Sequence, residues 1–470
     1  MIKKIMIIGA GESGTAIVRE LQQMPDYTVC CLIDDNIKKQ HTAICGIPIV
    51  STRDGIINHA KKYCIDEIII AMPSAPKQEI IKIIEICQKI ENVTIRILPS
   101  MYQLVDLDVA LPKLRSVEIE DLLGRDVITI ESETIKNLVK NKTILITGGG
   151  GSIGSELCRQ IAANNVGKLI IVDIYENNAY EIQQELIRNY PKLDLVVLIG
   201  SVRNSKKMNA IFAEYKPHIV FHSAAHKHVP LMEDSPNEAI KNNVFGTYKT
   251  ALAAASHNVE KFVLISTDKA VNPTNIMGAS KRICEMIIQL FSKKYDTEFV
   301  AVRFGNVLGS NGSVIPLFKQ QIAAGGPITV THPDIMRFFM TIPEAVSLVL
   351  EAGASAKGGE IFVLDMGEPV KIVDLAKNLI KLSGLELDSD ITIEFTGLRP
   401  GEKLYEELLM NEEGLQNTQN SLIYIGKPLD IDEQDFFEKL EYLRNAVENE
   451  SPDTKQIVKT IVPNYTSVTI

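Results

Sequence analysis

Two glycine-rich turns, each lying between a short apolar run and an amphipathic stretch, constrain this chain more than any other feature. The first turn is GAGESG at 9–14, after the apolar run 5–8; the second is GGGGSIG at 148–154, after the run 143–147. Such a strand-to-helix turn lets backbone N–H groups approach a pyrophosphate at the positive end of the helix. We therefore expect two nucleotide-binding folds in one chain.

The alternation of apolar and amphipathic segments around the first turn predicts an α/β domain. Strands are expected at 5–8, 29–33, 68–71 and 94–98, and helices at 15–24 and 78–89. Short apolar strands that alternate with amphipathic stretches favour a parallel sheet covered by helices. We assign 1–105 to a Rossmann-like accessory domain. The clear periodicity is lost afterwards, so 106–140 is expected to be a connector.

The second turn opens a longer series of the same kind. Strands are expected at 143–147, 168–172, 194–198, 219–221, 262–265 and 299–303. Such a series predicts a doubly wound parallel sheet, the second Rossmann-like fold of the chain. Beyond residue 303 the chain becomes rich in Gly and Pro, which is where we place a small substrate-binding portion of a catalytic domain 141–410. Residues 411–470 are expected to be an extension with a strand at 421–425, a helix at 433–449 and a mobile tail.

Composition excludes several classes of protein. A net charge of -10 argues against a nucleic-acid partner, because phosphate-backbone binding needs clustered Lys and Arg. The seven cysteines form no CxxC pair, so we expect a reduced protein without structural zinc. The apolar runs are far shorter than a membrane span, and no leader precedes the first strand. These features predict a cytoplasmic protein.

The second turn is the stronger candidate for a dinucleotide. Gly148, Gly151 and Gly154 have GxxGxxG spacing, and Asp173 ends the next strand, where a carboxylate can accept from the adenosine ribose. An acid there favours NAD over NADP. The first turn has Asp34 after its second strand, so it could bind a nucleotide by the same physics. An empty or regulatory domain fits it equally, and we leave it out of the catalytic site.

The chemistry is expected after the strand 262–265. Thr267, Asp268 and Lys269 place a hydroxyl, a carboxylate and an ammonium side by side at the carboxyl end of a sheet strand. A helix beginning near 275 sets Met277 and Lys281 one turn apart, so that Lys281 can reach the ribose beneath a nicotinamide. Taken alone, the pair at 268–269 is better interpreted as a solvated loop pair.

These motifs resemble one family. The turn 147–154, the STDK at 266–269 and the MxxxK at 277–281 resemble the extended short-chain dehydrogenase/reductases, specifically the bacterial nucleotide-sugar 4,6-dehydratases of polysaccharide and glycoprotein biosynthesis. The segments 303–307, 331–338 and 399–404 resemble the substrate-side motifs of that group, so the likeness covers about 121–407. The first domain resembles the extra domain of long, membrane-anchored members. Their transmembrane helices are absent here, so the resemblance implies a membrane-face location only for a form that carries them.

The sequence departs from the superfamily at one position. The usual YxxxK begins with Tyr, whereas this chain has Met277, whose thioether cannot abstract a proton. A helix without Tyr resembles the UDP-N-acetylglucosamine dehydratases that retain the C5 configuration, in which the Thr-Asp-Lys trio supplies acid and base. The alternative is a degenerate, inactive dehydrogenase.

The resemblance implies that UDP-N-acetylglucosamine becomes a 4-keto-6-deoxy sugar, with NAD⁺ reduced and regenerated in each turnover. Lys269 would be the C5 base, with a pKa lowered by the nicotinamide charge and by burial. Asp268 would donate to the departing C6 hydroxyl. Thr267 would bind the C4 oxygen, and Lys281 would bind the cofactor ribose.

Other residues are expected around the two ligands. The dinucleotide would be bordered by Ser152, Ile153, Ala224, Ala225, Lys227 and Asn243. The sugar nucleotide would be bound by Asn306, Arg337, Arg399 and Glu402, which also read as structural ion pairs of loops. The histidines at 222, 226 and 228 lack a third ligand at metal spacing, so no metal site is expected.

Two other functions compete with a dehydratase. A nucleotide-sugar 4-epimerase shares the cofactor and the C4 oxidation but has no use for a C5 base and a C6 acid. A noncatalytic NAD-sensing or sugar-nucleotide-sensing protein would explain Met277 as lost activity. Members of the resembled group commonly self-associate, so a homo-oligomer is implied in each case.

Overall fold

The computed structural model describes residues 2–90, 93–98, 114–118, 121, 133–408, 414–426, 428 and 430–466. The chain divides into two compact units. One comprises Met1–Val127, Gln321–Ile328 and Asp374–Ile393; the other comprises Ile128–Gln320, Thr329–Val373 and Glu394–Ile470. Across the described residues, no helix combines the length and the apolar character that a membrane span needs.

The first unit is built on a sheet with the strand order β3-β4-β2-β1-β5-β6-β7. Its pairs are parallel except β3–β4 and β6–β7 at the two edges. Apolar side chains on both faces of the central strands are buried, as a sheet covered on two sides requires. The elements are β1 (Lys3–Ile8), α1 (Glu12–Gln22), β2 (Tyr27–Ile33), β3 (Ala43–Ile44), β4 (Ile47–Ser51), α2 (Ile56–Tyr63), β5 (Glu67–Ile70), α3 (Lys77–Cys87), β6 (Thr94–Ile97) and β7 (Arg115–Ser116).

The second unit holds a larger sheet with the order β10-β9-β8-β11-β12-β13-β18-β22-β21. The strands are parallel from β10 to β18, and β22 and β21 add antiparallel pairs at one edge. The chain runs outward from β8 in both directions, so the switch point lies between β8 and β11. These strands are β8 (Thr143–Thr147), β9 (Lys168–Asp173), β10 (Leu195–Ile199), β11 (Ile219–His222), β12 (Lys261–Ile265), β13 (Glu298–Arg303), β18 (Ile361–Leu364), β21 (Leu415–Asn417) and β22 (Ile423–Gly426).

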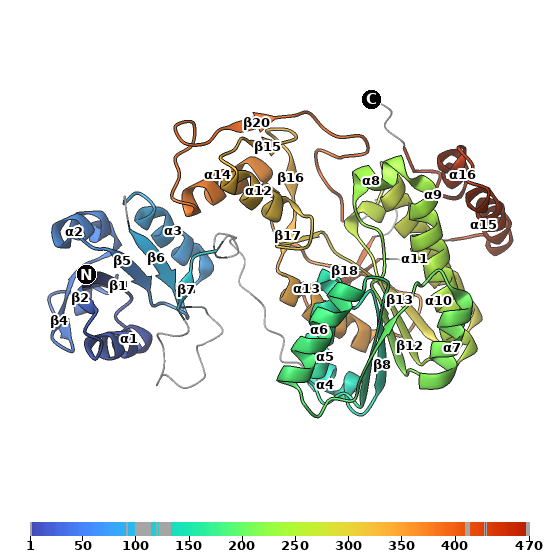
Figure 1. Ribbon diagram of the computed structural model, residues 1–470, viewed down its shortest axis with the longest axis horizontal. Coiled ribbons are helices and arrows are strands. Elements are labelled where there is room, and N and C mark those ends of the chain that lie inside the picture. The colour runs from blue at the N-terminus through green and yellow to red at the C-terminus, as the bar shows by residue number, and fades with distance from the viewer. Residues whose placement is uncertain are drawn as a thin grey trace. The chain divides into compact units, whose positions relative to one another are not determined.

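Helices cover both faces of this sheet (Figure 1). One core lies under α4 (Glu133–Val139), α5 (Ser152–Ala162), α6 (Glu176–Asn189) and α13 (Ile342–Ser355). The other lies under α7 (Ser205–Tyr215), α10 (Phe245–Ser256), α11 (Ile276–Lys294), α15 (Glu433–Glu448) and α16 (Thr454–Ile461). The expected α/β class with two Rossmann-like parallel sheets is confirmed.

Short elements complete the described chain. Among the small two-stranded sheets are β14–β17 and β16–β19, whose strands come after β13 in the chain. The short elements are α8 (Val229–Asp234), α9 (Pro236–Ala239), a π-helix (Ile240–Val244), a 3₁₀ turn (Asp268–Ala270), β14 (Asn306–Val307), α12 (Val314–Ala323), β15 (Ile328–Val330), β16 (Met336–Arg337), β17 (Phe339–Met340), β19 (Val370–Lys371), α14 (Ile372–Leu382) and β20 (Ile393–Phe395).

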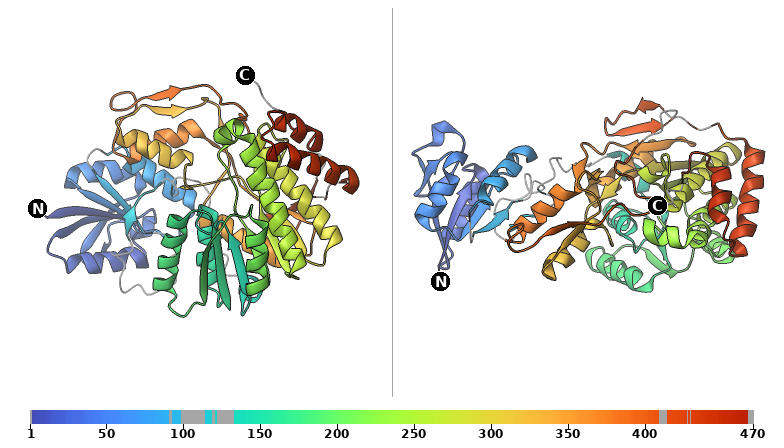
Figure 2. Two further views of the ribbon diagram at one scale, coloured as in Figure 1. Left: turned by 45° about the vertical axis from the view of Figure 1, so that its right-hand side comes forward. Right: turned by 90° about the horizontal axis from the view of Figure 1, so that it is seen from above.

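Two segments differ from the sequence expectation. Most of the expected connector 106–140 lies outside the described residues, but its end forms α4, whose Ile135 and Val139 are buried. The expected mobile tail instead forms α16, which packs with α15 beside α9 and α11 (Figure 2). After it, Asn464 Nδ2 donates to Asn272 Oδ1 at 3.1 Å and Thr466 N donates to Pro273 O at 3.0 Å. The tail therefore braces the loop that precedes α11.

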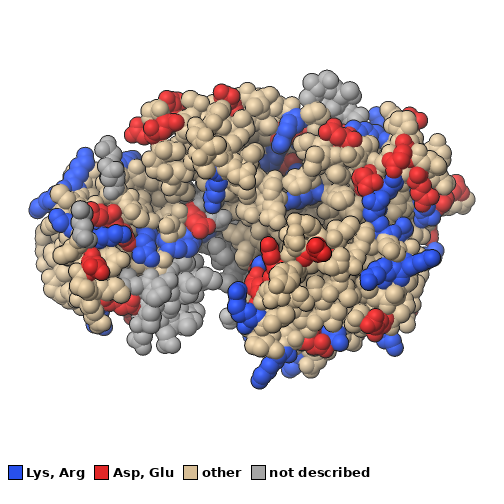
Figure 3. Space-filling view, viewed as in Figure 1, with Lys and Arg blue, Asp and Glu red and all other residues tan. Residues whose placement is uncertain are grey.

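Acidic and basic side chains are intermingled on the face of the molecule shown in Figure 3. No continuous basic surface is seen on that face among the described residues. This distribution agrees with the net charge of -10.

Candidate active site

The second glycine turn joins β8 to α5. Gly148 has φ +68°, and a Cβ built on it would lie 2.8 Å from the backbone of Ala224. Only glycine satisfies both conditions, because a side chain would be strained there and would also clash. A Cβ on Gly151 would meet only Gly148 O, at 3.3 Å, so the space above this residue is open. The turn is thus tight on its inner side and free on its outer side.

Asp173 at the end of β9 closes the turn. Its Oδ2 accepts from Gly150 N at 2.8 Å and its Oδ1 accepts from Tyr175 N at 2.8 Å. A carboxylate can accept about four hydrogen bonds, so each oxygen keeps a free lone pair for a ribose hydroxyl. The first unit repeats this arrangement, with Asp34 accepting from Ala10 N and Asn36 N.

A cavity of about 790 Å³ lies wholly within the second unit, beside this turn. Many of the residues expected at a site line it, and they come from segments far apart in sequence. These are Gly148, Gly151, Ser152, Ile153, Ala225, Lys227, Thr267, Lys269, Met277, Lys281, Asn306, Arg337, Arg399 and Glu402. The expected residues that do not line it are Gly154, Asp173, Ala224, Asn243 and Asp268.

Asn243 lies behind the cavity wall. Its side-chain amide accepts from His226 N at 2.8 Å and donates to His226 O at 3.0 Å and to Ser280 Oγ at 2.9 Å. It therefore ties the loop after β11 to α11. His222 in the same region bonds Thr147 and Thr247, and burial lowers its pKa to about 3. A neutral, doubly bonded imidazole of this kind belongs to the core.

The side chains of the trio at 267–269 contact one another. Thr267 Oγ1 donates to Asp268 Oδ1 at 2.8 Å, and Lys269 Nζ lies 3.1 Å from the same oxygen. Asp268 is 0% exposed, and its Oδ2 has no hydrogen-bond partner among the described residues. Gly278 lets α11 approach this segment, since a Cβ there would lie 2.1 Å from Lys269 O. Thr267 and Lys269 thus face the cavity, and Asp268 contacts both from behind.

The contact expected between Asp268 and the C6 hydroxyl stays a prediction, although Asp268 is completely buried in this structure. One sequence expectation changes here. Lys269 was expected to have a lowered pKa. Burial does lower the pKa of Lys269, but the carboxylates of Asp268 and Glu406 outweigh it and raise this pKa above its ordinary value.

The pKa of Lys281 changes in the opposite direction to that of Lys269. It is 5% exposed, lines the cavity, and has no hydrogen bond or ion pair recorded within the described part of the chain. Burial lowers its pKa. Met277, one turn earlier on α11, lines the same wall and is 4% exposed.

The expected substrate residues are largely paired with protein groups. Arg337 donates to the carbonyl oxygens of Met336 at 2.7 Å and Lys403 at 2.8 Å, and its guanidinium lies 3.5 Å from Glu402. Arg399, whose side chain is 56% exposed, pairs with the same Glu402 at 3.1 Å. In this structure Arg337 and Glu402 therefore form an ion pair between loops, which was the alternative to a role in substrate binding. Arg399 is more accessible to a ligand than Arg337.

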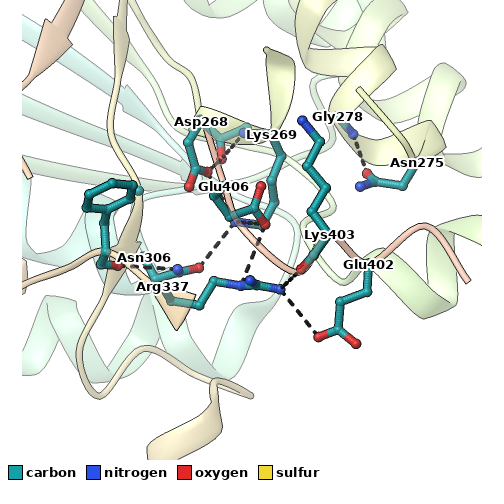
Figure 4. Close-up of polar contacts among 12 residues, drawn as sticks. Asp268, Lys269, Asn275, Gly278, Asn306, Arg337, Glu402, Lys403 and Glu406 are labelled. Carbon is teal, nitrogen blue, oxygen red and sulfur yellow. Dashed lines mark hydrogen bonds and ion pairs between the residues drawn. The ribbon is translucent and has the colours of Figure 1, made fainter. Parts of the chain in front are cut away.

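Sequence reasoning missed Glu406. Its Oε1 lies 3.5 Å from Lys269 Nζ and 3.6 Å from Arg337 Nε, and its side chain is 5% exposed at the cavity wall (Figure 4). Glu406 lies four residues after Glu402, just beyond the segment 399–404 that was singled out in the sequence. The sequence indicated this residue only through several acidic residues close together. That pattern does not show which carboxylate faces the cavity and which faces solvent.

A second missed group lies beneath the trio. Glu285 on α11 accepts from Ser266 Oγ at 2.6 Å, from Arg303 Nε and Nη2 at 2.7 Å each, and from Arg282 at 3.1 Å. All four residues are nearly or fully buried. Burial alone would raise the pKa of Glu285, but Arg303, Arg282 and Ser266 bring it to about 2. This network fixes α11 to the ends of β12 and β13, where the trio begins.

Comparison with known proteins agrees with this arrangement. A family model described as "Polysaccharide biosynthesis protein" matches residues 144–428, and one described as "CoA-binding domain" matches residues 2–99. The chain is 50% identical over 430 residues to the capsular polysaccharide biosynthesis protein CapD of Staphylococcus aureus, covering 90% of this chain and 72% of that protein.

Two further similarities cover about 60% of the chain. A protein of Rickettsia rickettsii (strain Sheila Smith) named UDP-glucose 4-epimerase is 40% identical over 283 residues, which are 58% of this chain and 79% of that protein. The X-ray structure of Pen from Bacillus thuringiensis is similar with a TM-score of 0.57 and 36% identity, covering 62% of this chain and 90% of that one.

Proposed function

The chain belongs to the polysaccharide biosynthesis protein family, and we propose that it is an NAD-dependent UDP-N-acetylglucosamine 4,6-dehydratase. The observation that carries this proposal is the Asp268–Lys269 pair, with its ammonium at the wall of a cavity that begins at a dinucleotide-type turn. In its deprotonated form, Lys269 is an amine that can remove a proton next to a carbonyl group.

The residues beside the turn fit a dinucleotide. The open space above Gly151 admits a pyrophosphate close to the backbone, and the free lone pairs of Asp173 suit a ribose diol, which favours NAD over NADP. Lys281 would bind the second ribose with its unpaired ammonium. When bound, NAD⁺ takes a hydride from C4 of the sugar and returns it to C6, so the overall reaction is redox-neutral.

The cavity lining suits a second anionic ligand. Its described lining residues include the cations Lys227, Lys269, Lys281, Arg337 and Arg399 and the acids Glu402 and Glu406. This positive excess favours the diphosphate of a sugar nucleotide. Arg399 is the cation we assign to that diphosphate, because its partner Glu402 is shared with Arg337 and its side chain is accessible.

The C4 step would use the Thr267–Asp268 hydrogen bond. The Thr267 hydroxyl donates to Asp268 Oδ1, so its oxygen can accept the proton of the C4 hydroxyl while it passes its own proton to Asp268. Asp268 then holds this proton out of reach of solvent. The resulting ketone acidifies the neighbouring C5–H bond.

The elimination would be carried by Lys269. As a free amine it takes the C5 proton and gives that proton to the C6 oxygen, and the C6–O bond breaks to release water. After C6 has been reduced, the proton held on Asp268 reaches C5 through Lys269, 3.1 Å away. Every proton removed is therefore returned or leaves in the water, and both residues regain their starting states.

A 4-epimerase is the second candidate, favoured by the 40% identity to a protein of that name. The lysine in the cavity argues against it, because epimerisation at C4 leaves C5 and C6 untouched. Incubation with UDP-N-acetylglucosamine and NAD⁺, followed by mass spectrometry, separates the two. A dehydratase gives a sugar lighter by one water molecule, and an epimerase gives an isobaric product.

Variants sharpen this test. We expect Lys269→Ala and Asp268→Asn to abolish the 4-keto product while NAD binding, measured by calorimetry, stays close to that of the wild type. Near-normal turnover in either variant would remove the basis of the proposal.

A further inference from the structure

The Lys269 ammonium is surrounded by three acceptors. Asp268 Oδ1 lies at 3.1 Å, Asn306 Oδ1 at 3.2 Å and Glu406 Oε1 at 3.5 Å from Nζ (Figure 4). Lys269 Nζ donates to Asp268 and Asn306, and it forms an ion pair with Glu406. These three groups together fix the position of the Lys269 side chain. Glu406 is the one that belongs to the 399–408 segment.

That segment is anchored to the loop that follows Lys269. Lys403 Nζ donates to Val271 O at 3.1 Å, and Asn272 Nδ2 donates to Glu407 Oε2 at 2.8 Å. These bonds on either side of Glu406 hold its backbone against the loop. The Glu406 side chain is 5% exposed, whereas that of Glu407 is 51% exposed. Neighbouring carboxylates thus differ in environment, one at the cavity wall and one at the surface.

We propose that Glu406 is a positioning residue that aims Lys269 into the cavity and governs the pH at which this amine loses its proton. The effect on turnover rests on the proposed function, in which Lys269 begins the cycle as a free amine. The effect on the Lys269 side chain itself does not depend on any reaction.

The sign of the effect follows from the charges that face Lys269. Asp268 and Glu406 are the anions, and Arg337 and Lys227 are the cations. Glu406→Gln leaves one anion against two cations, so the protonated form of Lys269 is less favoured. Deprotonation therefore moves to lower pH.

The first experiment measures Lys269 without catalysis. The full chain is modified with limiting acetic anhydride at a series of pH values, and peptide mass spectrometry gives the rate at each lysine. Because the free-amine fraction changes tenfold per pH unit below the pKa, a displacement of half a unit gives about threefold faster modification at fixed pH. We expect at least this increase at Lys269 in Glu406→Gln. The control Glu441→Gln, which removes an equal charge from the exposed surface of α15, should leave the rate unchanged.

The second experiment follows turnover of UDP-N-acetylglucosamine. In Glu406→Gln the rising limb of kcat against pH should move to lower pH, and its plateau should fall by roughly 10- to 100-fold from misaligned Lys269, with little change in KM. Glu406→Asp keeps the charge and should restore the wild-type limb. Melting temperatures of all variants check that they are folded.

The outcomes separate the two claims. Unchanged labelling of Lys269 in a folded Glu406→Gln overturns the inference, whatever turnover does. Shifted labelling in a chain whose wild type yields no dehydrated product supports the role of Glu406 and refutes the proposed function instead.

Discussion

The buried carboxylate of Glu285 gives the most quantitative prediction. It accepts from Ser266 and pairs with Arg303 and Arg282, and all of these side chains are removed from solvent. Glu285→Gln preserves the shape of the side chain but removes the buried carboxylate that pairs with Arg303 and Arg282. Breaking a buried pair in this way costs about 3–5 kcal/mol of folding free energy.

The pKa of Glu285 gives a similar magnitude. Its value of about 2, against 4.5 for an ordinary glutamate, corresponds to about 3 kcal/mol of stabilisation of the charged form. Because the folded-state pKa is the lower one, this contribution is complete above about pH 4.5. It is lost as the pH falls toward 2. The stability difference between wild type and Glu285→Gln should therefore shrink over the same interval.

The assay is urea unfolding at several pH values between 2.5 and 7, chosen as roughly the window that the two pKa values define. The chain contains no Trp, so circular dichroism replaces intrinsic tryptophan fluorescence. Hydrogen exchange of peptides from β12, β13 and α11 assigns the change to the second unit, since a two-unit chain need not unfold in one step. Glu441→Gln, whose exposed carboxylate pairs with Arg444, serves as the control and should change stability by less than about 1 kcal/mol. Equal stability of Glu285→Gln and wild type at pH 7 would refute the argument.

Three further changes test the site. Gly148→Ala should destabilise the second unit by about 1–3 kcal/mol in thermal unfolding, because it combines positive φ with a clash, whereas Gly151→Ala should fold normally yet bind NAD⁺ more weakly by calorimetry. Lys281→Met should lower kcat by roughly 100-fold or more at an unchanged melting temperature, since it removes an unpaired buried ammonium; a stable variant with wild-type kcat would contradict this role. Lys403→Met removes the bond to Val271 O and should raise KM for the sugar nucleotide in steady-state kinetics, and unaltered KM would show that this anchor is dispensable.

Local patterns in the sequence were enough to predict most of the framework. The strands at 143–147 and 262–265 were predictable because a parallel strand buried on both faces reads as an uninterrupted apolar run. The glycine turn and Asp173 lie within one βαβ unit, so their spacing is visible in the chain. Helix α16 was missed because its eight residues, TKQIVKTI, are too few for a convincing helical period.

The site was less predictable where it depends on long-range pairing. Nothing near Glu406 in the sequence shows that it meets Lys269, and Glu285 reads as a polar position on an amphipathic helix until Arg303 is placed beside it. The charge state of Lys269 depends on the same pairing. Sequence reasoning could anticipate the burial of Lys269 but not the second carboxylate, Glu406, which outweighs burial together with Asp268.

The brace that Asn464 and Thr466 provide has a consequence for biosynthesis. On the ribosome, the catalytic trio and Asn272 emerge long before Asn464, which lies 192 positions later. Under the proposed function, a nascent chain would bind dinucleotide once β8 to β13 have formed, while the loop leading into α11 still lacks its last hydrogen bonds. We expect arrested chains that stop before α15 to bind the cofactor without converting the sugar nucleotide. Catalytic activity would therefore appear only late in translation.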